Sequence, residues 1–149
     1  MKLQVKYVSE KIGKEIPEPF YATSGAAGMD LPACIDEPVT IKARARAKIP
    51  TGIAVALPSN EYAALVYVRS SLGFKKGVTL SNSVGVIDSD YRGEIFVSLN
   101  NISDEDYTVM PGERIAQLIV TPVVIPEISV VGELSETQRG EGGFGSTGK

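Results

Sequence analysis

Residues 81–97 (SNSVGVIDSDYRGEIFV) place an acidic turn between two apolar arms. The turn is Asp88-Ser89-Asp90, and its two acids, with Gly85 before them, predict a hairpin or a short β-loop. Beyond it, aliphatic residues occupy alternate positions from Ile95 to Leu99, which predicts a strand with one face turned inward. Such a turn can hold a carboxylate and a row of backbone donors and acceptors beside a ligand. The alternative is a surface turn whose acids serve only its conformation.

A second segment, Arg69-Ser70-Ser71, combines a cation with two hydroxyl groups after an apolar stretch. A hydroxyl residue at this place can cap a helical turn, and the free N–H groups of that turn, together with Arg69, would favour an anion. The segment therefore predicts either an anion site or an ordinary helix cap beside a solvated basic turn.

Two isolated polar residues stand in apolar surroundings. Asp30 lies between small residues and Leu31, where a carboxylate is usually a turn or cap acid but could also help to hold a divalent cation. Mg²⁺ commonly binds through one or two carboxylates with water and substrate phosphates, so the substrate would complete such a site. Gln117 interrupts the apolar run from Arg114 to Val120, and a polar side chain there needs a buried hydrogen bond or a ligand.

The residues from Glu136 onward are mainly glycine, hydroxyl and charged residues, with one aromatic, Phe144. This composition is typical of a flexible tail. The alternative is a lid that orders over a ligand, with Phe144 stacking on a planar group while Arg139, Ser146 and Thr147 contact phosphate.

Composition excludes several kinds of chemistry. The 149-residue chain has no histidine, which excludes His-based catalysis and leaves Asp, Glu, Lys, Tyr or water as acid or base. Its single cysteine, Cys34, excludes an intrachain disulfide and a cysteine-ligated zinc site, so we expect a reducing, cytoplasmic location. With 15 basic and 18 acidic residues the net charge is −3, and we expect no nucleic-acid partner.

The elements that must position these residues are predicted to be strands. The β patterns cover residues 3–8, 39–41, 53–57, 62–68, 78–81 and 114–120, and residues 62–68, apolar on both faces, are expected in the interior. Ser70 to Lys76 is the one short helical candidate, and no stretch approaches membrane-spanning length. Many short strands separated by Pro, Gly and Asn turns predict a single all-β domain of barrel, sandwich or jelly-roll type.

In order and spacing, five of these segments resemble the five motifs of the homotrimeric all-β dUTPases. The matching segments are Ala27–Leu31, Arg69–Gly77, Asn82–Glu94, Pro111–Leu118 and Arg139–Gly148. Two positions depart from the usual pattern, because Met29 stands where an aromatic is frequent and Ser71 where glycine is more familiar. The resemblance implies a distorted β-barrel or jelly-roll body at residues 1–134 and a flexible glycine-rich C-terminal lid at residues 135–149. It also implies a homotrimer whose active sites combine segments of three subunits.

The resemblance further implies hydrolysis of dUTP to dUMP and pyrophosphate, by attack of water on the α-phosphorus with Mg²⁺ bound to the triphosphate. Such an activity keeps uracil out of DNA and supplies dUMP for dTMP synthesis. Asp88 would orient and activate the water and contact the sugar 3′-OH, while Tyr91 would press against C2′ and exclude a ribose hydroxyl. Uracil would be read by Asn82 and by the backbone of Gly85, Val86 and Ile87.

The remaining motifs would serve the phosphates. By the same resemblance, Asp30 would hold Mg²⁺ through water, and the phosphate contacts would come from Arg69, Ser70, Ser71 and Gln117. In the C-terminal motif Phe144 would cover the base. The γ-phosphate would be gripped by Arg139, Ser146 and Thr147, with Gly145 between them.

Two other activities are compatible with such a scaffold. A dCTP deaminase shares the trimeric β fold, but the sequence DSDYRGE at Asp88 and the glycine-rich C-terminal motif resemble the hydrolases. A nucleotide-binding regulatory protein could use the fold to engage a partner, but the presence of Asp30, Asp88, Gln117 and Phe144 favours an active enzyme.

Overall fold

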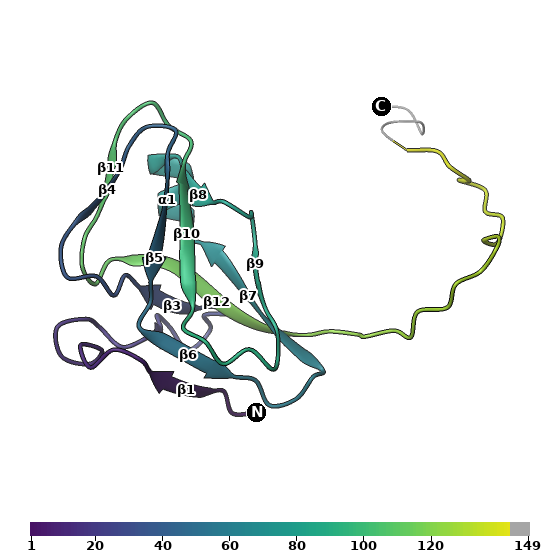
Figure 1. Ribbon diagram of the computed structural model, residues 1–149, viewed down its shortest axis with the longest axis horizontal. Coiled ribbons are helices and arrows are strands. Elements are labelled where there is room, and N and C mark those ends of the chain that lie inside the picture. Colours follow the sequence, from purple (N-terminus) through teal and green to yellow (C-terminus); the bar gives the residue numbers. More distant parts are fainter. Residues whose placement is uncertain (144–149) are drawn as a thin grey trace.

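The protein is built from short β-strands and one helix over residues 1–143, which are the residues that the computed structural model describes (Figure 1). The strands are β1 (Gln4–Tyr7), β2 (Phe20–Tyr21), β3 (Met29–Pro32), β4 (Val39–Ile41), β5 (Arg46–Pro50), β6 (Ile53–Ala56), β7 (Tyr62–Val68), β8 (Val78–Leu80), β9 (Gly85–Ile87), β10 (Phe96–Asn101), β11 (Tyr107–Val109) and β12 (Arg114–Pro122), and the helix is α1 (Ser70–Lys76). The predictions of an all-β fold and of a short helix at Ser70–Lys76 are confirmed.

The largest sheet has five strands in the order β2-β3-β12-β7-β9. β12 pairs antiparallel with β3 on one side and with β7 on the other. Side chains of β7 and β12 fill the core, where Ala64, Val66, Ile115 and Leu118 are at most 3% exposed. β7 lies between β12 and β9, so the prediction that residues 62–68 form an interior strand is confirmed. The sheet brings the start of β12 beside the end of β3 and the end of β7.

A second sheet has three strands in the order β5-β10-β8 and covers the other side of the core. In β10 the buried residues are Val97, Leu99 and Asn101, whereas Phe96 points outward and is 41% exposed. The predicted alternation beyond the acidic turn is therefore confirmed. Two smaller sheets pair β1 with β6 and β11 with β4.

The two arms of the acidic turn lie in different sheets. β9 pairs with β7 in the five-stranded sheet, whereas β10 pairs with β5 and β8 in the three-stranded sheet. The structure therefore has a β-loop here and not a hairpin. In a hairpin the two arms would pair with each other, whereas here each arm pairs with a strand from elsewhere in the chain. The edge of β9 that faces β10 is consequently left for other contacts.

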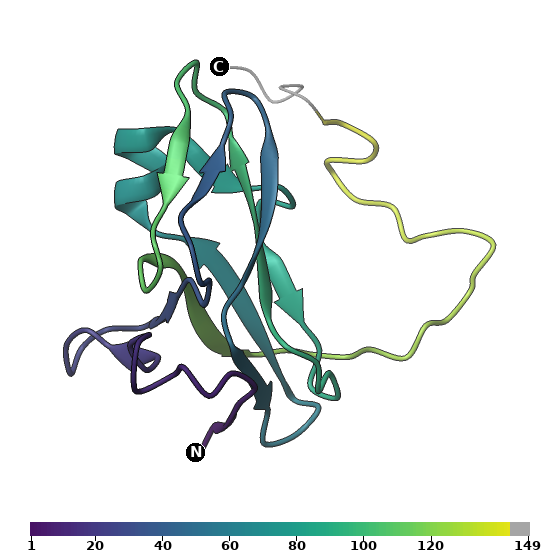
Figure 2. The same cartoon turned by 60° about the vertical axis from the view of Figure 1, so that its left-hand side comes forward.

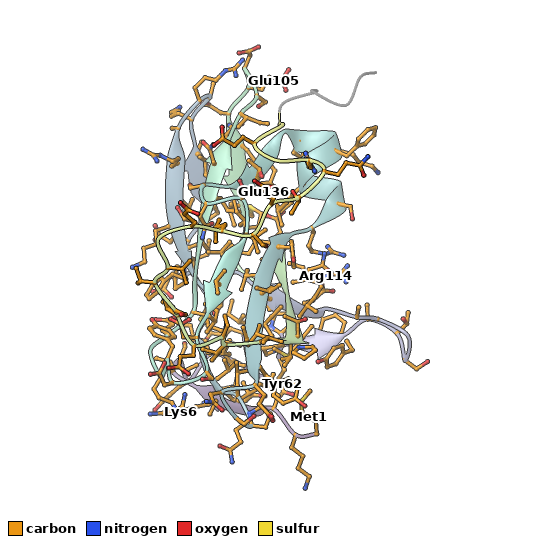
Figure 3. The ribbon with its side chains drawn as sticks, turned by 90° about the vertical axis from the view of Figure 1, so that its right-hand side faces the viewer. Met1, Lys6, Tyr62, Glu105, Arg114 and Glu136 are labelled. Atoms are coloured by element: carbon orange, nitrogen blue, oxygen red, sulfur yellow. The ribbon has the colours of Figure 1, made fainter. Side chains whose placement is uncertain are left out.

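The chain leaves the body after β12 and continues as an extended segment without helix or strand through residue 143 (Figures 1 and 2). Large apolar side chains along it are almost fully exposed, among them Val124 at 90%, Ile128 at 87% and Val130 at 94%. Figure 3 shows Glu105 at one end of the body, Met1, Lys6 and Tyr62 at the other, and Arg114 between them. Over residues 1–143 no helix has the length and apolar character needed to cross a membrane.

Candidate active site

A cavity of about 620 Å³ opens where β3, β12 and the junction of β7 with α1 meet. We call it the Arg69 pocket, and the lining residues that matter here are Gly28, Asp30, Arg69, Ser70, Ser71 and Gln117. The register of the sheet explains their proximity, because Gln117 of β12 lies opposite Asp30 of β3 and opposite Tyr67 of β7. The residues predicted to contact phosphate or the metal ion, apart from those of the C-terminal motif, therefore all line one pocket. They are Asp30, Arg69, Ser70, Ser71 and Gln117.

Asp30 is the buried centre of this pocket, with only 6% of its surface exposed. Its Oδ1 lies 3.1 Å from Nε of Arg69, and its Oδ2 accepts a hydrogen bond of 2.9 Å from Nη1 of Arg114. Burial of a carboxylate is costly unless it is paired and hydrogen-bonded, and here both oxygens have a guanidinium partner. The Phe20 ring lies 5.7 Å from the Arg114 guanidinium on its other side. Two cations around one anion leave the pocket with a net positive charge.

Ser70 and Ser71 are the first two residues of α1. The helix cap is Arg69, and no side chain forms a cap hydrogen bond, so the predicted hydroxyl cap is wrong. The reason is that the helix begins at Ser70, one residue earlier than a Ser70 cap would require. Both hydroxyls lie at the mouth of the pocket beside the first N–H groups of the helix, which have no partner within a helix. This arrangement offers donors to an anion.

The residues expected to contact base and sugar line two smaller cavities on either side of the acidic turn. The Asp88 pocket, about 290 Å³, is lined by Lys48, Asp88, Tyr91 and Glu94 together with Val86, Ile87 and Phe96. The Asn82 pocket, about 130 Å³, is lined by Asn82 and Gly85 and shares Val86, Ile87 and Phe96 with the first. The Asn82 pocket therefore lies between β9 and β10, which do not pair with each other.

Local hydrogen bonds fix the turn itself. The Tyr91 N–H donates to the carbonyl of Asp88 at 3.2 Å, and the Tyr91 hydroxyl donates to the carbonyl of Glu94 at 3.0 Å. Arg92 donates to the carbonyls of Ser89 and Tyr91, and Glu94 Oε1 accepts a bond of 2.8 Å from the Gly52 N–H. Asp88 is exposed at the end of β9. Its carboxylate can thus reach a ligand in the adjacent cavity.

No residue lines both the Arg69 pocket and either of the other two cavities. Arg139 lies outside all three, in the extended segment, where its Nε donates to the carbonyl of Gly142 at 2.9 Å. Phe144, Gly145, Ser146 and Thr147 fall outside the described residues. The structure of one chain therefore groups the predicted residues into two separate sites.

Sequence reasoning missed three residues that the structure adds to these sites. Arg114 was seen only as the start of a strand, although it stands three residues before Gln117. Phe96 lines both small cavities, and the Lys48 ammonium lies 3.8 Å from the centre of its ring. The alternation of β10 could have identified Phe96, because it turns a large aromatic side chain away from the core. Nothing local in the sequence pointed to Lys48.

The donor set around Asp30 fits only an indirect role for a metal ion. In the described part of the chain no group of three Asp, Glu or Cys side chains is close enough to bind a cation. Both Asp30 oxygens are already paired with guanidinium groups, so a direct metal bond would have to displace an arginine. A remaining lone pair can accept from a metal-bound water. The site therefore fits Mg²⁺ only where a ligand supplies most of the coordinating oxygens.

Comparisons with known proteins agree with this geometry. The sequence pattern of the dUTPase family matches residues 14–148. The deoxyuridine 5′-triphosphate nucleotidohydrolase of Idiomarina loihiensis is 52% identical over 147 residues, which cover 99% of this chain and 97% of that protein. The dUTPase of Staphylococcus bacteriophage 80alpha with dUPNHPP superposes with a TM-score of 0.85 at 30% identity and 99% coverage of both chains. A dUTPase of phage phi11, 23% identical with a TM-score of 0.78, is described with a structural Mg(II) ion.

Proposed function

The chain belongs to the dUTPase family and hydrolyses dUTP to dUMP and pyrophosphate, and we propose that the Arg69 pocket and the two pockets of the turn divide this reaction between them. The observation that carries the proposal is the difference in their linings. The Arg69 pocket is lined by a guanidinium group, an ammonium group, two hydroxyls and a carboxamide. The other two pockets are lined by a backbone edge, an aromatic ring and an exposed carboxylate. The first suits a triphosphate and the second a nucleoside.

In the Arg69 pocket, Arg69, Ser70, Ser71 and Gln117 donate to the phosphate oxygens. A charge-assisted hydrogen bond is about twice as strong as a neutral one, and Arg69 is already oriented by its ion pair with Asp30. Less side-chain entropy is therefore lost when the triphosphate binds. Positive charge next to the α-phosphorus also stabilises the negative charge that develops during attack.

Uracil is read in the Asn82 pocket by Asn82 and by the free backbone edge at Gly85, Val86 and Ile87. Uracil presents an N3–H donor between two carbonyl acceptors, and cytosine inverts two of these three groups. Each buried polar group left unpaired costs about 1–3 kcal/mol, so a fixed backbone edge rejects cytosine without a charged side chain. Thymine is rejected by close packing at C5.

Asp88 orients the attacking water, takes its proton and contacts the sugar 3′-OH. A carboxylate is a suitable base in a chain that has no histidine. Tyr91 lies against C2′, where a ribose hydroxyl would collide with the ring. The ring is suited to this role because its hydroxyl is tied to the carbonyl of Glu94.

Mg²⁺, when bound to the triphosphate, neutralises phosphate charge and polarises the phosphoryl oxygens. Asp30 would hold it through water, as far as its two arginine partners leave a lone pair free. In the reaction itself the side chains of the Arg69 pocket orient the phosphates, and Asp88 orients the water.

The active enzyme is a homotrimer that combines pockets from different subunits. Two observations support this assembly. The Arg69 pocket shares no lining residue with the cavities of the turn, and the extended segment carries exposed apolar residues that need a covering surface. Residues 1–134 form the body, and residues 135–149 form a lid that closes over the substrate. The lid places Phe144 over the base and brings Arg139, Gly145, Ser146 and Thr147 to the γ-phosphate.

In the cell this single-domain enzyme acts in the cytoplasm, where it keeps uracil out of DNA and supplies dUMP for dTMP synthesis. Its single cysteine, Cys34, is free in the structure, which suits a reducing compartment. Nucleic acids and membranes are not partners of the enzyme.

The experiment that tests this function is pyrophosphate release from dUTP, dCTP, dTTP and UTP, with Mg²⁺ and with EDTA. We expect rapid release from dUTP with Mg²⁺ and little from the other three nucleotides. Ammonia release from dCTP would identify a deaminase instead. Tight dUTP binding without hydrolysis at micromolar enzyme would identify a regulatory nucleotide-binding protein.

A further inference from the structure

Two glycines lie against side chains that the proposed reaction requires. A β-carbon at Gly28 would lie 2.6 Å from Oε1 of Gln117, 3.1 Å from its Cβ and 3.2 Å from its Cδ. A β-carbon at Gly93 would lie 2.6 Å from Cζ of Tyr91 and would overlap the hydroxyl oxygen. Carbon and oxygen atoms of neighbouring residues do not approach this closely. Neither side chain could keep its present place beside an alanine.

The backbone does not require glycine at these two positions. Gly52, Gly77 and Gly112 have φ values of +71°, +62° and +73°, where other residues are strained. Gly28 and Gly93 are not among the glycines with positive φ, so an alanine could adopt their conformation. What these two positions require is empty space next to a functional side chain.

We propose that Gly28 and Gly93 are positioning residues, Gly28 for the Gln117 carboxamide in the Arg69 pocket and Gly93 for the Tyr91 ring in the Asp88 pocket. This inference rests on the proposed function, because it takes Gln117 as a phosphate contact and Tyr91 as the residue that excludes ribose. It adds that the Gln117 and Tyr91 side chains can occupy their places only because Gly28 and Gly93 have no β-carbon.

In each pair the side chain, and not the backbone, would move. Gln117 lies in the centre of the five-stranded sheet, paired on both sides and flanked by Ala116 and Leu118, which are both 0% exposed. Its backbone is therefore fixed, and only its flexible end can turn away from a methyl group. Tyr91 is 43% exposed, so its ring can swing into solvent when Gly93 gains a side chain. Both substitutions should spare the fold and displace a functional group.

For the phosphate pair, the variant is Gly28→Ala and the matched control is Gly25→Ala, whose β-carbon would have no neighbour within 4 Å. Because one hydrogen bond to a charged group is lost, kcat/KM for dUTP should fall about tenfold or more in Gly28→Ala and stay unchanged in Gly25→Ala. In a Gln117→Ala background, Gly28→Ala should cause no further loss. An equal loss in both backgrounds would overturn the role, as would unchanged kinetics of the single variant.

For the sugar pair, the variant is Gly93→Ala and the measured quantity is the ratio of kcat/KM for dUTP to that for UTP. We expect the ratio to fall, because a displaced ring no longer collides with the ribose hydroxyl. In a Tyr91→Ala background Gly93→Ala should leave the ratio unchanged. A loss of dUTP activity without a change of ratio would contradict the inference, since it would reveal a merely structural role.

A measurement without substrate separates this inference from the proposed function. In NMR spectra of the whole protein, Gly28→Ala should shift the side-chain amide resonances of Gln117, and Gly93→Ala should shift the ring resonances of Tyr91. Gly25→Ala should shift neither, and all three thermal midpoints should stay close to wild type. Unshifted resonances in the two variants would refute the positioning role. If the resonances shift in the variants but the wild-type protein does not hydrolyse dUTP, only the proposed function is refuted.

Discussion

In the Arg69 pocket a buried carboxylate holds two guanidinium groups at 3.1 and 2.9 Å, whereas beside the Asp88 pocket the Tyr91 and Arg92 side chains are tied to backbone carbonyls of their own turn. The first site joins residues far apart in the chain, since Arg114 stands 84 positions after Asp30. Apart from Lys48, the second is built within one short segment, with Tyr91 and Glu94 three positions apart.

We propose that this difference separates two tasks. Charged groups held by the sheet bind phosphate strongly but do not distinguish one nucleoside triphosphate from another. A backbone edge and a close-packed ring distinguish base and sugar through shape and unpaired polar groups. Loss of the buried Asp30 charge should therefore lower stability, whereas changes in the turn should affect turnover and selectivity without unfolding the protein.

The largest effect is expected from Asp88→Asn, which tests the turn as the site of chemistry. The amide keeps the shape of the side chain but cannot accept the proton of water, so kcat should fall by about 10²- to 10⁴-fold while dUTP still binds. Single-turnover kinetics and equilibrium binding of dUTP measure the two quantities. The neighbouring Asp90→Asn serves as the control and should remain active. A near-normal kcat in Asp88→Asn would refute the role.

Removal of Arg139 to Lys149 should have the next largest effect and tests whether the two sites suffice without the C-terminal motif. Catalysis should weaken severely because the proposed lid contacts to the substrate are lost. The body should stay folded, since within residues 1–143 the Arg139 side chain bonds only to Gly142 of its own segment. Circular dichroism and light scattering follow the fold and the assembly. An unfolded or monomeric product would contradict a lid that contributes nothing to the core.

Asp30→Asn tests whether the buried ion pairs of the Arg69 pocket stabilise the fold. Loss of the buried charge leaves two guanidinium groups facing each other, and the free energy of unfolding should fall by about 3 kcal/mol. Urea unfolding in EDTA measures this without a contribution from Mg²⁺. The control, Asp104→Asn, removes an exposed partner of Arg44 and should change the value by less than about 0.5 kcal/mol. Equal effects in the two variants would contradict a stabilising role of the buried Asp30 ion pairs.

The smallest effect is expected from Lys48→Met, which tests the wall between the two small cavities. The ammonium lies over the Phe96 ring, and loss of a cation–π contact at an exposed site is worth about 0.5–1 kcal/mol. KM for dUTP should rise about two- to fivefold with kcat unchanged. Lys42→Met, which removes an exposed partner of Asp106, is the matched control and should leave KM unchanged. A larger effect in the control would exclude this role for Lys48.

Sequence predicted well those elements whose apolar pattern is dictated by burial. β7 and β12 are apolar on both faces because they lie inside a sheet, and their positions follow from that pattern. β5 was missed, since Arg46 and Lys48 on its exposed face hide the buried Ile49 in a basic run. Local patterns show which residues a strand buries only where its exposed residues do not dominate the composition.

The candidate site was predicted as a set of residues but not as an arrangement. Motif order identified Asp30, Arg69 and Gln117, whereas the ion pairs of Asp30 depend on the register between β3 and β12. The separation of the turn's arms into two sheets depends in the same way on which strand each arm meets. Neither property has a local signal in the sequence. Long-range pairing therefore decides how the known residues act together.

The most direct test of this division of tasks compares kcat/KM for dUTP and UTP in Gln117→Ala and Tyr91→Ala. Gln117→Ala should lower both values by the same factor and preserve their ratio, because the phosphates of the two nucleotides are identical. Tyr91→Ala should reduce the ratio, because UTP gains access to the Asp88 pocket. An altered ratio in Gln117→Ala, or a preserved one in Tyr91→Ala, would contradict the account.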